Sequence, residues 1–384
     1  MMSDLAKFAA RLSEWIRRAP PGDRTPTGDA VPPGAEHEPQ FNALALELFA
    51  LQFDANGAYR KLCEARGVRP GRLTHWSEIP AVPTAAFKEL EMTCLPPERR
   101  ERVFESSGTT RRATSRHFHD ATSLALYEMS AWRWFRAHVT PEVGHSPMRW
   151  RGLFLAPPPQ EAPRSSLVSM FEVVRRELGL GAEVFVGHVS GDGAWELDGE
   201  TALRVLREAG ERGEPVLALG TAFSFVHLLD GLAAGGLRFA LPRGSRVMET
   251  GGYKGRAREL SRAELHAQVS ERLGVPLENI VREYGMCELS SQAYDAVVCG
   301  EEAATRPQRQ FRFPPWARAR VVSPETGEEV AVGETGLLRV FDLANVCSVL
   351  AVQTEDLAVR GEEGFELAGR LANAEPRGCS LLAA

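Results

Sequence analysis

Short apolar runs alternate with amphipathic stretches through the middle of the chain, and this alternation restricts the possible folds more than any other feature of the sequence. Strand-like runs occur at residues 152–155, 184–186, 216–219 and 280–283. Helical patterns occur at residues 167–178, 203–207, 223–232 and 261–273. Strands that alternate with helices are typical of βαβ units. We therefore predict an α/β fold with mostly parallel sheets and helices on both faces.

The last of these helices has the clearest boundaries. Ser261 and Glu264 form a capping-box pattern at its start, and Gly274 follows its last apolar residue, Leu273. The next strand, at residues 280–283, should therefore carry residues 284–288 onto the loop that follows it. In a parallel sheet, ligands bind beyond the carboxyl ends of the strands, so this loop is a candidate site.

The N-terminal segment has helical spacing of apolar residues, at Leu5, Phe8, Leu12 and Trp15, with charged residues between them. It lacks the unbroken apolar stretch of a signal peptide, and no run elsewhere is long enough to span a membrane. Residues 20–40 are rich in Pro, Gly and small polar residues and predict an extended or mobile connection.

A packed helix is predicted over residues 41–66, where Phe41, Leu44, Leu48 and Leu51 share one face. From Ala319 the pattern changes to short strands and tight turns, which is typical of antiparallel β structure. Strands are predicted at residues 319–322, 329–332 and 336–341. We divide the chain into an N-terminal helix and linker (1–40), a main domain (41–370) with a β-rich part at about 311–370, and a tail (371–384).

Composition excludes several classes of protein. The 384 residues are 43% hydrophobic and 25% charged with a net charge of -6, which is ordinary for a globular protein and does not favour nucleic acid as a partner. The six cysteines show no CxxC pair, which favours neither a zinc site nor a disulfide framework. They suit a reducing cytoplasm. The cysteines are Cys63, Cys94, Cys287, Cys299, Cys347 and Cys379.

A Ser/Gly/Thr loop follows a strand-like segment that begins at Phe104. It consists of Ser106, Ser107, Gly108, Thr109 and Thr110. Such a loop can bind phosphates, because glycine lets the backbone approach while hydroxyls and amides donate hydrogen bonds. Taken alone, it is equally well explained as an ordinary turn, and the lysine of a P-loop is absent. The nearby segment 117–120 holds two histidines and an aspartate, but no further metal ligands at useful spacing.

Two carboxylates lie where a nucleotide site would need them. Glu288 is the one acid in the loop after the strand at 280–283 and is a candidate magnesium ligand. Asp356 follows an apolar run and could accept hydrogen bonds from both ribose hydroxyls. A solvated loop carboxylate and a surface turn remain the alternatives for these two residues.

The order of these motifs resembles the large domain of the acyl-adenylate-forming superfamily, which includes acyl-CoA synthetases, luciferases and peptide-synthetase adenylation domains. The resemblance implies that residues 106–110 contact phosphates, that Glu288 holds Mg²⁺ and that Asp356 binds the ribose. It further implies nucleotide contacts at Gly251, Gly252, Tyr284, Gly285, Met286 and Arg370. The chain departs from the usual pattern at residues 111–112, where two arginines replace a glycine and a lysine.

Two further segments, at residues 79–88 and 375–381, resemble one branch of this superfamily, the acyl-protein synthetase (LuxE) family. Most superfamily members continue into a small C-terminal lid domain, which we expect this chain to lack because it ends at Ala384. The resemblance implies that Cys379 accepts the acyl group. Arg377 would favour the thiolate, and Gly378 gives the backbone freedom beside it.

The expected function is therefore ATP- and Mg²⁺-dependent activation of a fatty or other carboxylic acid to acyl-AMP. The acyl group would then pass to Cys379 and on to a partner protein such as an acyl reductase. A free-standing acyl- or aryl-CoA ligase and a non-catalytic nucleotide-binding module remain alternatives. Lys254 is either a cation near the carboxylate or a solvated lysine, and Phe223 and Phe225 either line a tunnel or belong to the core.

Overall fold

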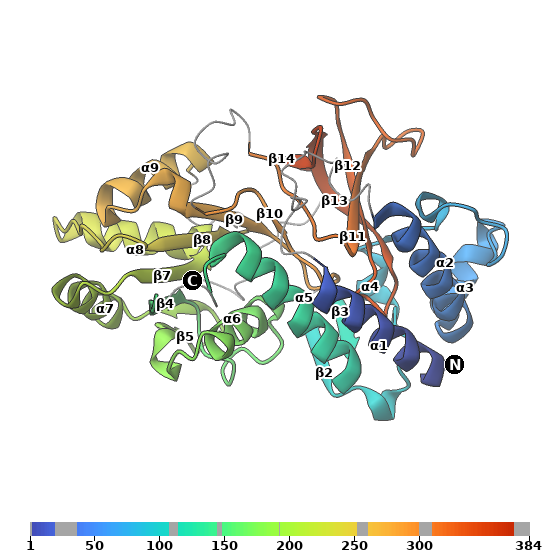
Figure 1. The fold of residues 1–384 in the computed structure, drawn as a ribbon, viewed down its shortest axis with the longest axis horizontal. Coiled ribbons are helices and arrows are strands. Elements are labelled where there is room, and N and C mark those ends of the chain that lie inside the picture. Colours follow the sequence, from blue (N-terminus) through green and yellow to red (C-terminus); the bar gives the residue numbers. More distant parts are fainter. Residues whose placement is uncertain are drawn as a thin grey trace.

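The computed structural model describes residues 2–19, 37–106, 114–143, 148–191, 193–251, 260–298 and 309–371. Within these ranges the framework consists of two five-stranded sheets and two separate hairpins (Figure 1). The first sheet has the order β10-β9-β8-β7-β4, and its strands are parallel except for β10, which is antiparallel to β9. Its strands are β4 (Arg151–Leu155), β7 (Val216–Thr221), β8 (Arg246–Thr250), β9 (Ile280–Tyr284) and β10 (Ala293–Tyr294).

Helices cover both faces of the first sheet. Helices α5 (Ala121–Val139) and α6 (Ser166–Glu177) pack on one face, where Phe154, Leu219 and Met248 belong to their hydrophobic core. The opposite face is covered by α7 (Gly199–Arg212), α8 (Ala222–Ala234) and α9 (Arg262–Leu273). The predicted α/β architecture is confirmed. Successive residues of a buried strand face opposite layers of helices, and both sets of residues are apolar.

The second sheet takes four strands from residues 317–370 and one, β1, from residues 82–83. Its order is β1-β13-β12-β11, with β14 also paired to β13, and all pairs except β1 with β13 are antiparallel. The strands are β1 (Val82–Pro83), β11 (Ala317–Val322), β12 (Thr335–Asp342), β13 (Ala351–Arg360) and β14 (Phe365–Arg370). The hairpins are β2 (Arg102–Glu105) with β3 (Arg116–His119), and β5 (Gly187–Val189) with β6 (Trp195–Leu197).

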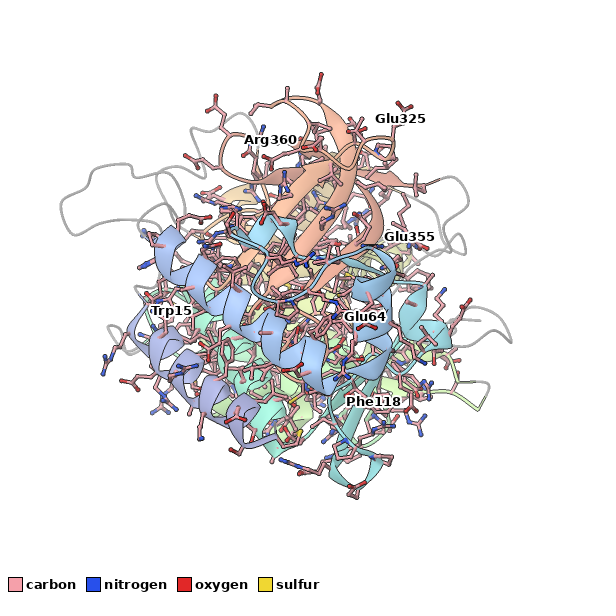
Figure 2. All side chains as sticks on the ribbon, turned by 90° about the vertical axis from the view of Figure 1, so that its right-hand side faces the viewer. Trp15, Glu64, Phe118, Glu325, Glu355 and Arg360 are labelled. Atoms are coloured by element: carbon pink, nitrogen blue, oxygen red, sulfur yellow. The ribbon has the colours of Figure 1, made fainter. Side chains whose placement is uncertain are left out.

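The N-terminal helices pack against the rest of the protein through their apolar faces. Helices α1 (Met2–Arg18) and α2 (Glu38–Ala55) lie side by side below the second sheet, which carries the labelled Glu355 and Arg360 (Figure 2). The predicted apolar face of α1, which includes Leu5 and Trp15, is buried in the largest core. The remaining short helices are α3 (Gly57–Ala65) and α4 (Ala86–Glu89), and 3-10 turns at Trp76–Glu78, Pro97–Arg99, Ala182–Val184 and Leu277–Asn279. None of the helices in the described ranges is long and apolar enough to cross a bilayer.

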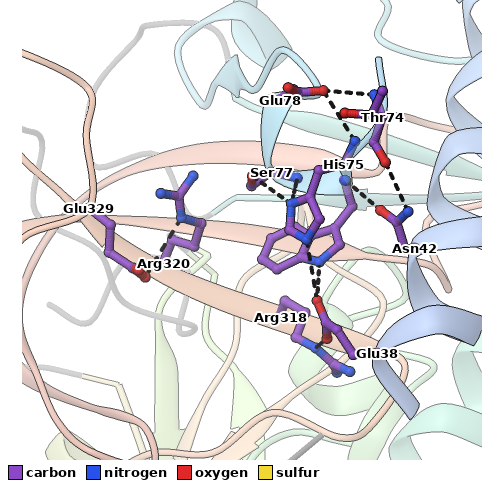
Figure 3. A network of polar contacts seen from close by, with 10 residues as sticks. Glu38, Asn42, Thr74, His75, Ser77, Glu78, Arg318, Arg320 and Glu329 are labelled. Atoms are coloured by element: carbon purple, nitrogen blue, oxygen red, sulfur yellow. Dashed lines mark hydrogen bonds and ion pairs between the residues drawn. The ribbon is translucent and has the colours of Figure 1, made fainter. Parts of the chain in front are cut away.

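A polar network fixes α2 to the second sheet (Figure 3). Glu38 at the start of α2 accepts hydrogen bonds from Nε1 of Trp76 and, at 3.2 Å, from Nε of Arg318 on β11. Asn42 accepts a 2.7 Å hydrogen bond from the backbone N–H of Trp76. Arg320 on β11 lies 3.6 Å from Glu329, in the connection between β11 and β12. These contacts join segments far apart in the chain.

Three predicted elements are wrong in detail. The helix predicted over residues 41–66 is two helices. The first begins at Glu38, within the predicted connection over residues 20–40. Residues 20–36 of that connection lie outside the described residues. The predicted helix breaks because the buried Asn56 caps α3 by accepting a hydrogen bond from the N–H of Tyr59.

The other two differences concern strands. Residues 184–186 make one bridge, Phe185 to Phe154, and the regular strand β5 begins at Gly187. Residues 329–332 form no strand beyond a bridge from Glu329 to Val322, because β11 pairs directly with β12. Short apolar runs predict strands poorly, since a run forms a strand only where a neighbouring strand pairs with it. The capping box of Ser261 and Glu264 is confirmed.

Candidate active site

The two sheets bring three of the predicted nucleotide-contacting residues together. Tyr284 ends β9, Asp356 lies on β13, and Arg370 ends β14 directly opposite Asp356 in the strand register. The hydroxyl of Tyr284 donates a 2.7 Å hydrogen bond to Oδ2 of Asp356. Nε of Arg370 lies 3.0 Å from Oδ1 of the same carboxylate, in an ion-pair contact. Asp356 therefore joins the carboxyl end of the first sheet to the second sheet.

Arg370 has donor capacity that the described residues do not use. One terminal nitrogen of its guanidinium bonds Glu355 at 2.7 Å, while the other, Nη1, is buried with no hydrogen-bond partner among the described residues. A buried guanidinium donor without an acceptor is costly. An anionic or polar ligand at this point would satisfy it.

Aromatic side chains surround the ring of Tyr284. It makes edge-on contacts with Phe311, Phe313 and Phe365, with ring centroids 5.6 to 6.2 Å apart. The sulfur of Met286 lies 3.9 Å from the Tyr284 hydroxyl. Gly251 follows β8 at the neighbouring strand end, where a φ of 74° suits glycine, and Gly252 lies outside the described residues. The aromatic rings on one side and the glycine on the other suit the planar base of a nucleotide.

The loop after β9 is held firmly in place. Asp342 accepts 2.8 Å hydrogen bonds from the N–H of Ser290 and the hydroxyl of Ser291. Burial raises the pKa of Asp342 to about 6, although these bonds oppose the shift. Asn345 donates 2.9 Å to the carbonyl of Glu288, whose side chain is buried and whose Oε2 lies 3.2 Å from Sγ of Cys287. The segment 342–345 therefore fixes Glu288.

The hairpin β2–β3 carries the predicted phosphate loop. Ser106 closes its base, because its N–H donates to the carbonyl of Ser115 at 3.1 Å and its hydroxyl accepts from the N–H of Ser115 at 2.9 Å. Ser107, Gly108, Thr109 and Thr110 lie outside the described residues. Two hydrogen bonds between Ser106 and Ser115 therefore close the base of the hairpin.

His117 connects this hairpin to the Glu288 loop. Its Nδ1 lies 2.8 Å from the carbonyl oxygen of Cys287. Burial lowers the pKa of His117 to about 4, although the nearby Glu288 charge opposes that shift, so at neutral pH the uncharged ring donates Nδ1–H. The His119 ring packs 4.2 Å away. Within the described ranges no group of three His, Cys, Asp or Glu side chains is placed to hold a metal ion.

Sequence reasoning missed a second buried acid at the same strand end, Glu283. It accepts a hydrogen bond from the hydroxyl of Thr250 on β8. Burial raises the pKa of Glu283 to about 7, and the charge of Glu249 adds to the shift. The only signal in the sequence was its place immediately before Tyr284. Asp342 and Asn345 carried no local pattern either, and His117 was considered only as part of a segment with too few metal ligands.

The C-terminal tail contains the predicted acyl-acceptor cysteine. Cys379, Arg377 and Gly378 lie outside the described residues, as do Lys254 and Cys299. The described cysteines are all buried. Burial raises the pKa of Cys63 to about 11 and that of Cys347 to about 12, and it raises that of Cys94 as well. Buried thiols of this kind are poor nucleophiles at neutral pH.

A cavity of about 400 Å³ lies beyond the carboxyl end of β4, between α7 and α8. Phe223 lines it together with Trp195 and His227, whereas Phe225 is fully buried in the core. Of the two phenylalanines considered as tunnel walls, Phe225 is therefore a core residue. The volume of the cavity is within the range of about 300–1,000 Å³ that is usual for small-molecule pockets.

Comparison with known proteins gives consistent results. Residues 33–383 match the family described as "Acyl-protein synthetase, LuxE". The long-chain-fatty-acid--luciferin-component ligase of Aliivibrio fischeri is 23% identical over 357 residues, which cover 88% of this chain and 86% of that protein.

Among solved structures, 2-hydroxyisobutyryl-CoA ligase has the same fold at 14% sequence identity. In its thioesterification state it superposes with a TM-score of 0.64 over 89% of this chain and 69% of the ligase. In an open conformation the TM-score is 0.63 over 94% of this chain and 83% of the ligase. The fold is therefore that of the adenylate-forming ligases.

Proposed function

Because the chain belongs to the acyl-protein synthetase (LuxE) family of AMP-forming ligases, we propose that it converts a carboxylic acid and ATP to acyl-AMP and then carries the acyl group on Cys379. One observation carries the proposal most directly. Tyr284, Asp356 and Arg370 meet at the carboxyl end of the first sheet, where α/β proteins bind nucleotides.

The nucleotide would lie across this edge. Each oxygen of the Asp356 carboxylate can accept more than one hydrogen bond, so the group would accept from the ribose hydroxyls. The unpaired Nη1 of Arg370 would donate to the nucleotide. The adenine would pack near Tyr284 and the glycines after β8. Residues 106–110 would donate to the phosphates.

Glu288 fits a magnesium site. Mg²⁺ in nucleotide enzymes is usually held by one or two carboxylates, phosphates and water, so a single well-fixed carboxylate is sufficient. Bound there, the ion would neutralise charge that develops on the phosphates. The link through His117 keeps the Glu288 loop beside the hairpin that carries the phosphate loop. This contact supports a shared role for Glu288 and the hairpin in binding phosphates.

The first half-reaction is a displacement at phosphorus. A carboxylate oxygen of the acid bonds to the α-phosphorus of ATP, the bond from that phosphorus to the bridging oxygen breaks, and pyrophosphate leaves. Negative charge spreads over the transferred group, and preorganised donors stabilise it without reorganisation. Arg370 and the hydroxyls and amides at residues 106–110 would supply these donors.

The second half-reaction is acyl transfer to sulfur. The thiolate of Cys379 attacks the acyl carbon, the carbon–oxygen bond to the phosphate breaks, and AMP leaves with the bonding electrons. The thiol proton goes to solvent. Cys379 is favoured because the described cysteines are buried, and thiolate character controls nucleophilicity. The thioester would then pass to a protein acceptor such as an acyl reductase.

The relative from Aliivibrio fischeri is named a long-chain-fatty-acid ligase, and a fatty acid is the substrate class that this relationship supports. The test is pyrophosphate release against a panel of acids, with and without coenzyme A, followed by intact-mass analysis. Acid-dependent release with an acyl adduct on the protein is expected. Release that needs coenzyme A and yields acyl-CoA would instead establish a CoA ligase, and no release with any acid would favour a non-catalytic module.

A further inference from the structure

The two sides of the β9 end have different chemical character. Alternate residues of a strand point to opposite faces of a sheet. Tyr284 points to the aromatic residues and Asp356, whereas Glu283 bonds Thr250 on the face covered by α5 and α6. Gln292 lies just before β10 and, by extension of the pairing of Ala293 with Tyr284, stands opposite Gly285. Thr250, Glu283, Gly285 and Gln292 form what we name the Glu283 cluster.

One buried acceptor of this cluster, on Gln292, is not satisfied by the described residues. Thr250 donates to Oε2 of Glu283. Gln292 is 5% exposed, and its Oε1 has no hydrogen-bond partner among the described residues. Buried polar atoms are nearly always paired, so the unpaired Oε1 of Gln292 indicates a ligand that donates.

Gly285 leaves room for the carboxylate of Glu283 beside the strand end. A Cβ at this position would lie 2.3 Å from Oε1 of Glu283 and 3.4 Å from Cγ of Gln292. Because glycine has no side chain, the carboxylate oxygen reaches the strand end next to Tyr284. The cluster therefore borders the same edge as the proposed nucleotide site.

We propose that the Glu283 cluster binds a hydrogen-bond-donating substituent, a hydroxyl or an ammonium group, that the substrate acid carries close to its carboxyl group. The inference rests on the proposed function, because it assigns the acid of that reaction. The acid's carboxylate must reach the α-phosphorus of a nucleotide held by Tyr284 and Asp356. Its first carbon atoms would therefore pass the opposite side of the same strand end, where Glu283 and Gln292 lie.

An unsubstituted acyl chain would leave the buried acceptor of Gln292 unpaired. A site built to hydrogen-bond a substrate group discriminates strongly against an analogue that lacks it. The chain should therefore differ from an enzyme for simple fatty acids, although its substrate can still bear a hydrocarbon tail. Hydroxyl and ammonium substituents share the donor chemistry, and the experiment separates them.

The experiment is acid-dependent exchange of pyrophosphate into ATP, measured with decanoic acid and its 2-hydroxy, 3-hydroxy, 2-amino and 3-amino derivatives. At least one derivative is expected to exceed decanoic acid in kcat/KM by about tenfold or more. Glu283→Gln and Gln292→Met should each reduce this preference. Glu283→Gln keeps the shape of the side chain, and Gln292→Met tests the cluster separately if the first variant does not fold.

Equal kcat/KM for decanoic acid and all four derivatives would overturn the inference while leaving the adenylation activity established. A preference that neither variant changes would overturn it as well, because the selecting group would lie elsewhere. Absence of exchange with every acid in a folded protein would refute the proposed function itself, and the inference with it.

Discussion

The hydroxyl of Tyr284 and the carboxylate of Asp356, 72 residues apart in the chain, meet at 2.7 Å between the two sheets. This hydrogen bond joins the carboxyl end of β9 to β13, and both side chains are buried. The pairing of Asp356 with Arg370 across neighbouring strands adds a charge of the opposite sign. The carboxylate is thus oriented before any nucleotide binds. This preorganisation reduces the conformational entropy that is lost on binding.

Asp356→Asn should weaken ATP binding by about tenfold or more. The amide loses the negative charge that strengthens hydrogen bonds to both ribose hydroxyls, and a hydrogen bond to a charged group contributes about 1.5–3 kcal/mol. Titration calorimetry with ATP would measure the effect. Tyr284→Phe is the matched control, because it removes the hydroxyl at 2.7 Å but leaves the carboxylate, and it should weaken ATP binding less. Wild-type affinity in a folded Asp356→Asn protein would argue against ribose binding here.

Glu288→Gln should reduce acid-dependent pyrophosphate release by roughly 10²-fold, which is the scale for loss of one electrostatic stabiliser. The amide keeps the size of the side chain, so the anchored loop should remain folded. Rates over a range of Mg²⁺ concentrations would measure the loss. The exposed Glu278, in the turn before β9, provides the control variant Glu278→Gln, which should react at the normal rate. If both variants show the wild-type rate, Glu288 is not a magnesium ligand.

Cys379→Ala should still form acyl-AMP but no hydroxylamine-labile thioester. The adenylation residues lie in the two sheets, whereas the thiol acts only after the adenylate has formed. Intact mass and peptide mapping after incubation with ATP, Mg²⁺ and acid would show the adduct. An adduct that persists at full yield in Cys379→Ala, or that maps to another cysteine, would contradict the acyl-carrier role.

Glu283 should make the protein less stable as the pH rises from about 4.5 to 7. Burial raises the pKa of Glu283 from its ordinary value of 4.5 to about 7, so the unfolded chain loses this proton at a lower pH than the folded protein. Below 4.5 both states are protonated, and above 7 both are ionised. Stability therefore falls across the interval, by about 3 kcal/mol if no other group responds.

Urea denaturation of the wild type and Glu283→Gln across this pH range would test the effect. The variant lacks the titrating group, so its stability relative to the wild type should rise between pH 4.5 and 7 and then level off. Other buried acids such as Asp342 are present in both proteins and cancel in the difference. A constant difference at all pH values would show that Glu283 titrates normally.

Local pattern in the sequence was enough for most of the framework. The helices α6, α8 and α9 and the strands β4, β7 and β9 occur where apolar spacing predicted them, because that spacing directly reflects which face of each element is buried. The predictions were wrong where the pattern carried no information about partners. Asn56 divides one predicted helix, and the run at residues 329–332 finds no neighbouring strand.

The sequence by itself determined the fold class and named Glu288 and Asp356 as candidates, because carboxylates at these positions suit a nucleotide site, whereas Tyr284 and Arg370 were implied by the resemblance to the adenylate-forming superfamily. Their roles stay predictions. Only the tertiary structure decided which of them meet, that His117 ties the phosphate hairpin to the Glu288 loop, and that Glu283 is a buried acid with a raised pKa. Proximity and desolvation depend on residues distant in the chain, so no local pattern encodes them.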